Sequence, residues 1–188
     1  MDNIIFLDID GVLNCENGFR DGLCPYMTWG NTDKGEYHMK FYPQSKELIN
    51  KLIEKTQSKV VASSTWRKSG LDWLKKVWEL ENMSGEIIGI TPVMSFKSGK
   101  SVPRGCEIES YLKDKGFLHI NWSDEEQLKY MKSSDIRNYI IIDDDSDMLF
   151  KQRKHFIHVE PSPRNREGFN ETHYYEALDT LNKTLLTI

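Results

Sequence analysis

Two uninterrupted apolar runs mark buried strands, and each of them ends in acidic residues. The first run, Ile4-Ile5-Phe6-Leu7, stops at Asp8-Ile9-Asp10-Gly11, and the second, 138–142, stops at Asp143-Asp144-Asp145. Short runs that are apolar on both faces are typical of central strands in a parallel sheet. We therefore expect two neighbouring buried strands whose carboxyl ends carry acids.

Amphipathic segments alternate with further short apolar runs along the rest of the chain. Pro43 opens a segment in which Leu48, Ile49, Leu52 and Ile53 recur at helical spacing, which predicts a helix to about residue 57. The other expected elements are helices over 71–80, 103–115 and 171–181, the last capped by Asn170, and strands over 59–62, 86–90 and 155–159. Strands that alternate with helices predict an α/β domain with a mostly parallel sheet.

Two segments show no clear periodicity in their hydrophobic positions. Residues 12–42 are rich in glycine, asparagine and aromatic residues, so we interpret them as a loop plus a small insertion, in the form of a hairpin. Residues 116–134 form a second expected insertion, with a short helix from Asp124. We expect a single domain over residues 1–188.

Composition excludes several classes of protein. The chain has 188 residues, of which 38% are hydrophobic and 29% charged, which is typical of a folded domain. Its net charge of −4 predicts no bulk attraction to nucleic acid or to anionic membranes. No run approaches the roughly 20 apolar residues of a membrane helix, and the N-terminus lacks the features of a signal peptide. Three cysteines without zinc-site spacing indicate free thiols, so we expect a cytoplasmic protein.

The acids at the strand ends are the strongest functional signal. Ligands bind beyond the carboxyl ends of the strands in open α/β sheets, where Asp8, Asp10, Asp143 and Asp144 fall. Carboxylates that converge are costly without a cation. Mg²⁺ fits because it binds a few carboxylates and keeps waters for a phosphate.

Groups that bind phosphate follow the other expected elements. Ser63 and Ser64 end the 59–62 strand, and Lys100 and Arg104 lie just before or at the start of a helix. A helix N-terminus is itself an anion site. A carboxylate nucleophile, a second carboxylate, a hydroxyl, a cation and metal ligands together indicate phosphoryl transfer.

The order of these motifs resembles the haloacid dehalogenase (HAD) superfamily over roughly residues 3–150. Its four motifs are matched in turn by residues 8–13, by residues 60–63, by Arg104 with Lys100 as second choice, and by residues 140–144. The resemblance implies a Rossmann-like three-layer sandwich with a small cap insertion at about 14–42. A finer likeness, in Ser63-Ser64-Thr65-Trp66-Arg67 and in residues 104–108, is to small HAD proteins associated with RNA repair.

The resemblance also implies the roles of individual residues. Asp8 is expected to attack phosphorus, and Asp10 to act as general acid and then as general base. The metal ligands are expected to be Asp8, Asp143, the backbone carbonyl of Asp10, and Asp144 acting through water, with Asp147 as a substitute for the second acid.

The same resemblance assigns residues to the substrate phosphate. Ser63 is expected to bind it, with Ser64 as the competing assignment, and Arg104 to offset its charge. The residues assigned to substrate binding are Ser64, Lys100, Arg67 and Gly11. For Arg67, a surface ion pair is an equal alternative.

Aromatic residues flank the expected site. Two interpretations stay open for Tyr26, Trp29, Tyr37, Phe41 and Tyr42, namely the core of a small cap or stacking on a nucleobase. We expect Trp66, Trp73 and Trp78 to pack a helix against the sheet.

The expected function is Mg²⁺-dependent hydrolysis of a phosphomonoester through an aspartyl-phosphate on Asp8. The expected partner is a phosphorylated small molecule or a nucleic-acid end, and we expect no membrane partner. Phosphatases of sugar phosphates or phosphoproteins, and a phosphate-binding module without turnover, are the alternatives. The sequence does not give the oligomeric state.

Overall fold

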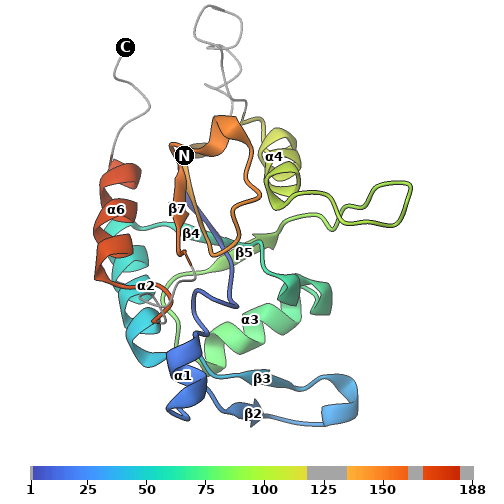
Figure 1. Cartoon of the computed structure of the whole chain (residues 1–188), viewed down its shortest axis with the longest axis vertical. Helices are drawn as coiled ribbons and strands as arrows, with labels where there is room; N and C mark the ends of the chain where they lie inside the picture. The colour runs from blue at the N-terminus through green and yellow to red at the C-terminus, as the bar shows by residue number, and fades with distance from the viewer. Residues whose placement is uncertain (1, 118–134, 161–166, 183–188) are drawn as a thin grey trace, which may run out of the picture.

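The centre of the protein is a parallel sheet of five strands in the order β5-β4-β1-β6-β7. The computed structural model describes residues 2–117, 135–160 and 167–182. Every neighbouring pair of strands in this sheet is parallel, as the sequence predicts (Figure 1). The strands are β1 (Asp2–Leu7), β4 (Lys59–Ala62), β5 (Ile87–Ile90), β6 (Ile136–Asp143) and β7 (Phe156–His158).

Helices cover both faces of the sheet because the central strands are apolar on both faces. On β1, Ile5 and Leu7 belong to one core and Ile4 and Phe6 to the other, which follows from the period of two in a strand. The first core includes residues of α2 (Pro43–Thr56), α3 (Leu71–Leu80) and α6 (Glu171–Asn182), and the second includes residues of α4 (Arg104–Asp114). The expected Rossmann-like three-layer sandwich is thus confirmed (Figure 1).

Local sequence signals set the helix ends. Pro43 occupies the first turn of α2, where its missing N–H costs nothing, and Gln57 ends the helix in the left-handed conformation. Asn170 caps α6, since its Oδ1 accepts a hydrogen bond from the backbone N of Thr172 at 3.1 Å. Helix α4 begins at Arg104, one residue after the proline that marks it in the sequence. The expected helices therefore hold to within a residue or so at their ends.

Residues 14–42 fold as a short helix and an antiparallel hairpin beyond the carboxyl end of β1 (Figure 1). The hairpin is tied to α3, because Trp73 Nε1 donates to the Gly35 carbonyl at 2.7 Å and His38 Nε2 lies 2.7 Å from Glu81 Oε1. Its elements are α1 (Glu16–Arg20), β2 (Tyr26–Thr28), η1 (Thr32–Lys34) and β3 (Tyr37–Met39). The hairpin form is confirmed, and its role as a cap stays a prediction.

Two further 3₁₀ turns are η2 (Thr65–Ser69) and η3 (Phe150–Gln152). The helix expected from Asp124 lies outside the described residues. All three cysteines are free thiols, as expected. No helix in the described parts of the chain is long and apolar enough to cross a membrane.

Candidate functional site

Three carboxylates meet where β1 and β6 end. The register pairs Leu7 with Ile142, so the next residues, Asp8 and Asp143, emerge side by side. One carboxylate oxygen from each of Asp8, Asp143 and Asp144 lies within 4.8 Å of the others. This arrangement could hold a divalent cation, because hard cations take carboxylate oxygens as ligands.

Burial makes this acidic cluster costly without a positive partner. Asp8 is 5% exposed and Asp143 is 0% exposed. Burial raises the pKa of Asp8, and burial together with the neighbouring Asp8 raises the pKa of Asp143 to about 8. The same two causes raise the pKa of Asp144 to about 6. Asp8 Oδ1 and Asp143 Oδ2 are buried and accept no hydrogen bond from the described residues, so both oxygens need a positively charged neighbour.

Arg104 supplies the positive charge beside this cluster. Its Nη1 lies 3.3 Å from Asp8 Oδ1 and its Nε lies 3.5 Å from Asp143 Oδ2. Burial acts to lower the pKa of Arg104, but Asp8, Asp143 and Asp147 outweigh it and the pKa is raised. Asp147, a candidate ligand from the sequence, instead accepts a hydrogen bond at 2.8 Å from the backbone N of Arg104 at the start of α4.

Lys100, the second choice for this cation, does not share the position of Arg104. Its side chain is exposed on a loop closed by the isolated bridge between Ser95 and Ser101. This loop, between β5 and α4, projects outward from the sheet (Figure 1). Of these two cations, the structure therefore brings Arg104 to the acids and leaves Lys100 apart from them.

Asp10 lies outside the three-acid cluster, at the exposed rim of the site. Its Oδ2 accepts a hydrogen bond from Trp66 Nε1 at 2.9 Å, and its Oδ1 accepts one from Asn14 Nδ2 at 3.4 Å. Gly11 follows with a φ of +77°, and a Cβ at this position would lie 2.2 Å from Asp144 Oδ2. Glycine is therefore needed here, both for the backbone angle and for the close approach of Asp144.

The buried side chain of Arg67 stabilises the turn after β4 through hydrogen bonds to its backbone. Arg67 Nη1 donates to the carbonyls of Ser63 at 2.7 Å and Ser64 at 2.8 Å, and its Nη2 forms an ion pair with Glu107. Of the two alternatives for Arg67, the ion pair is present, but it is buried and not on the surface as expected. Since Arg67 is buried and both of its Nη atoms are engaged, it positions the turn, and we do not retain it as a phosphate ligand.

The two serines of this turn are both buried but differ in their contacts. Ser64 Oγ accepts a hydrogen bond at 3.3 Å from the backbone N of Trp66, and its hydroxyl helps to stabilise the Asp8 carboxylate. Ser63 Oγ has no hydrogen-bond partner among the described residues. Of the two serines, Ser63 therefore has the hydroxyl without a partner among the described residues, and its binding of the phosphate stays a prediction.

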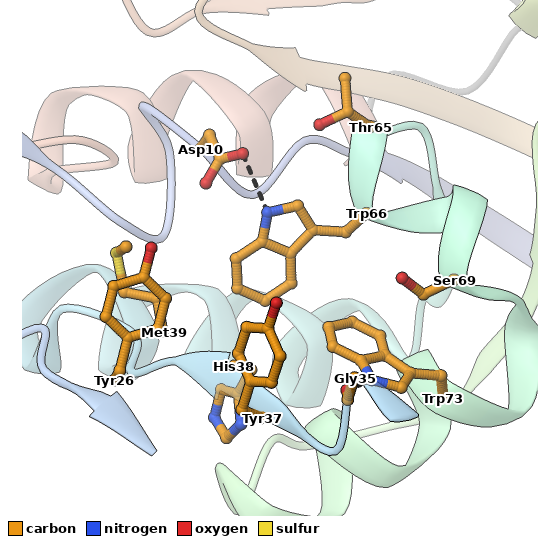
Figure 2. Close-up of a pocket in the computed structure, with 10 residues that line it drawn as sticks. All are labelled: Asp10, Tyr26, Gly35, Tyr37, His38, Met39, Thr65, Trp66, Ser69 and Trp73. Atoms are coloured by element: carbon orange, nitrogen blue, oxygen red, sulfur yellow. Dashed lines mark hydrogen bonds between the residues drawn. The ribbon is translucent and has the colours of Figure 1, made fainter. Parts of the chain in front are cut away.

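A pocket of about 400 Å³ opens beside Asp10. Figure 2 shows Trp66 between Asp10 and the tyrosines of the hairpin. The lining residues are Asp10, Tyr26, Gly35, Tyr37, His38, Met39, Thr65, Trp66, Ser69 and Trp73.

The tryptophans pack as expected, and two of them also line the pocket. Trp78 is buried in the core as expected. Trp66 and Trp73 are only partly buried against that core, and they also line the pocket, with ring centroids 5.6 Å apart. The sequence contained one sign that Trp66 lies at the site, because Trp66 comes two residues after the serine pair that follows β4.

Comparison with known proteins identifies the family. The model of a family described as the HAD domain in Swiss Army Knife RNA repair proteins matches residues 4–173. The search of curated proteins found no match. The match covers the sheet, the three-acid cluster, Arg104 and the aromatic pocket, and the chain therefore belongs to the family of HAD domains of Swiss Army Knife RNA repair proteins.

Proposed function

We propose that the protein is a Mg²⁺-dependent phosphomonoester hydrolase that acts on the terminal phosphate of a nucleotide or nucleic acid. The observation that carries the proposal is the contact of Arg104 Nη1 with Asp8 Oδ1 at 3.3 Å beside two further carboxylates. A buried carboxylate paired with a fixed cation is well placed to react with a phosphate, because the cation offsets the charge of both.

In the first step, a carboxylate oxygen of Asp8 attacks phosphorus, and the bond from phosphorus to the leaving oxygen breaks. Asp10 donates a proton to that oxygen, so the product leaves as an alcohol. Trp66 Nε1 holds the Asp10 carboxylate at 2.9 Å, which supports this role by fixing its orientation. In the second step, Asp10 takes a proton from water and the water oxygen attacks phosphorus. The bond from phosphorus to the Asp8 oxygen breaks, so inorganic phosphate is released and the Asp8 carboxylate is regenerated.

Other residues of the chain hold the phosphate during both steps. Arg104 offsets the charge that builds on the equatorial oxygens, and the Ser63 hydroxyl donates to one of them. Bound Mg²⁺, held by Asp8, Asp143 and Asp144, would supply further charge neutralisation and orient the phosphate. The nucleic-acid part of the proposal rests on the family match, whose description names RNA repair.

Phosphate release tests the proposal. The substrates are p-nitrophenyl phosphate, mononucleotides, and oligonucleotides phosphorylated at the 3′ or the 5′ end, each with Mg²⁺ and with EDTA. Asp8→Asn keeps the shape of the side chain and removes the nucleophile, while Asp33→Asn, at an exposed position on η1, serves as the matched control. We expect Mg²⁺-dependent release that Asp8→Asn abolishes and Asp33→Asn leaves intact. No release from any oligonucleotide or nucleotide would overturn the assignment of substrate.

A further inference from the structure

We propose that the aromatic pocket beside Asp10 binds the nucleobase of the terminal nucleotide whose phosphate is removed. The inference rests on the proposed function and adds a specificity site to it. The pocket walls that carry the argument are Tyr26 and Tyr37 of the hairpin and Trp66 and Trp73 of η2 and α3.

The position of the pocket indicates which part of the substrate it receives. Asp10 lines the pocket, and it is the residue proposed to protonate the leaving oxygen. The leaving group of a phosphomonoester must therefore extend from phosphorus towards Asp10 and beyond it. What lies beyond Asp10 is Trp66 and then the hairpin tyrosines (Figure 2). For a terminal nucleotide, the group beyond the leaving oxygen is the sugar with its base.

The chemistry of the walls fits a flat uncharged ring rather than a second phosphate. No lysine or arginine is found among the described residues that line the pocket, and Asp10 is the carboxylate among them. A phosphate would meet this negative charge without a cation to offset it. Aromatic side chains stack on any base, and each such contact is worth roughly 1–3 kcal/mol. The volume of about 400 Å³ is within the usual range of small-molecule pockets.

Strand β3, which forms one side of the pocket, is tied to α2 and α3. The buried His38 lies 2.7 Å from Glu81 Oε1, and Lys46 Nζ lies 3.4 Å from the other oxygen of the same carboxylate. Burial acts to raise the pKa of Glu81, but His38 and Lys46 outweigh it and the pKa is lowered. The contact between His38 and Glu81 and the hydrogen bond from Trp73 to the Gly35 carbonyl together attach β3 to the main domain. A preformed pocket loses little conformational entropy on binding.

The tyrosines leave aromatic surface for a ligand to cover. Tyr26 is 71% exposed and Tyr37 is 41% exposed, and their ring centroids are 6.2 Å apart. Trp66, in contrast, is partly buried and anchored by its hydrogen bond to Asp10. A base that entered between the tryptophan wall and the hairpin would bury apolar area on both.

Equilibrium binding tests the proposal without any need for turnover. The probes are two fluorescent oligoribonucleotides with the same terminal phosphate, one with a base on the terminal nucleotide and one abasic there. Fluorescence anisotropy in EDTA gives both affinities for the full chain. From the stacking energies above, we expect the base to raise affinity about tenfold or more. A ratio near one would overturn the proposal whether or not the protein hydrolyses phosphate esters.

Substitutions in the pocket test whether the gain in affinity from the terminal base arises there. Tyr26→Leu and Tyr37→Leu should each lower the affinity ratio severalfold, because leucine keeps apolar area but cannot stack. Tyr175→Leu, on α6 at 63% exposure, is the matched control and should leave the ratio unchanged. If both pocket variants keep the wild-type ratio, the base binds elsewhere and the proposal is wrong. Competition by nucleoside monophosphates distinguishes the source of the base: equal competition indicates a free nucleotide, and weak competition indicates a nucleic-acid end.

Discussion

Neutralising Asp143 should stabilise the metal-free protein, although the residue is buried at the heart of the site. Asp143→Asn keeps the shape of the side chain and keeps an Oδ1 that can accept the backbone hydrogen bond of Asp145, observed at 2.9 Å. What the variant removes is one of three carboxylates whose oxygens lie within 4.8 Å of each other. The unfolded chain is hardly affected, since its carboxylates are far apart and hydrated.

The structure gives the size of the effect. At an effective dielectric constant of about 20, two charges 4.8 Å apart repel by about 3.5 kcal/mol, and Asp143 faces two such neighbours. Its attraction to Arg104 Nε at 3.5 Å amounts to about 5 kcal/mol on the same scale. The net repulsion is therefore about 2 kcal/mol. Lost hydration of the buried carboxylate adds to this value, so we expect a gain of about 2 kcal/mol or more.

The gain should depend on pH in a defined direction. The pKa of Asp143 is raised from 3.8 to about 8 and that of Asp144 from 3.8 to about 6. Between about pH 4 and about pH 8, the folded protein therefore binds more protons at these two residues than the unfolded chain does. The free energy of unfolding of the metal-free wild type must then fall as pH rises from about 4 to about 8. The variant loses the larger part of this dependence, because asparagine does not titrate. The free energy of unfolding of the variant should exceed that of the wild type only slightly near pH 4, and by the full amount at pH 9.

Urea unfolding followed by tryptophan fluorescence at several pH values in EDTA measures this directly. The control is Asp33→Asn, which should match the wild type at each pH. Saturating Mg²⁺ should raise wild-type stability by about 2.7 kcal/mol at 100 times its dissociation constant, and the variant much less. Repulsion within the acidic cluster is ruled out as the cause if Asp143→Asn is less stable than the wild type at pH 9, or if the stability difference between the two proteins is the same at every pH.

Three further substitutions test other contacts. Gly11→Ala should weaken Mg²⁺ binding by tenfold or more in a calorimetric titration, because its Cβ would lie 2.2 Å from Asp144 Oδ2, and normal affinity would contradict the packing. Arg67→Met should cost about 3–5 kcal/mol in urea unfolding, because it leaves Glu107 buried without its partner, and Glu107→Gln in the same chain should recover part of the loss. Trp66→Phe removes the indole donor to the proposed general acid but keeps a ring, so kcat should fall severalfold while KM changes little; an unchanged kcat would remove the orienting role.

The sheet and the acidic cluster could be predicted because their signals are local. The run Ile4–Leu7 is apolar on both faces, and the residues after it are acidic, so the strand and its position near a second acidic strand end follow from the pattern alone. The helices were predictable for the same reason, since Pro43 and Asn170 act on their own first turns.

Contacts between distant segments were not predictable in the same way. Arg67 lies next to an exposed lysine in the sequence, and only the packing of α4 against the turn brings Glu107 to it over 40 positions. Trp66 meets Asp10 across 56 positions, and no periodicity encodes that contact. The choice between Arg104 and Lys100 depended on where the loop after β5 ends and α4 begins, which sequence spacing does not fix.

If Asp8 carries the phosphoryl group during turnover, the phosphorylated protein can be trapped before water hydrolyses it. The protein is mixed with Mg²⁺ and an oligonucleotide bearing a radiolabelled terminal phosphate, quenched in acid within one turnover, digested and analysed by mass spectrometry. We predict a labelled phosphate on the peptide that contains Asp8, removable by hydroxylamine and absent from Asp8→Asn. Release of phosphate without any label on Asp8, or turnover that persists in Asp8→Asn, would show that Asp8 is not the nucleophile.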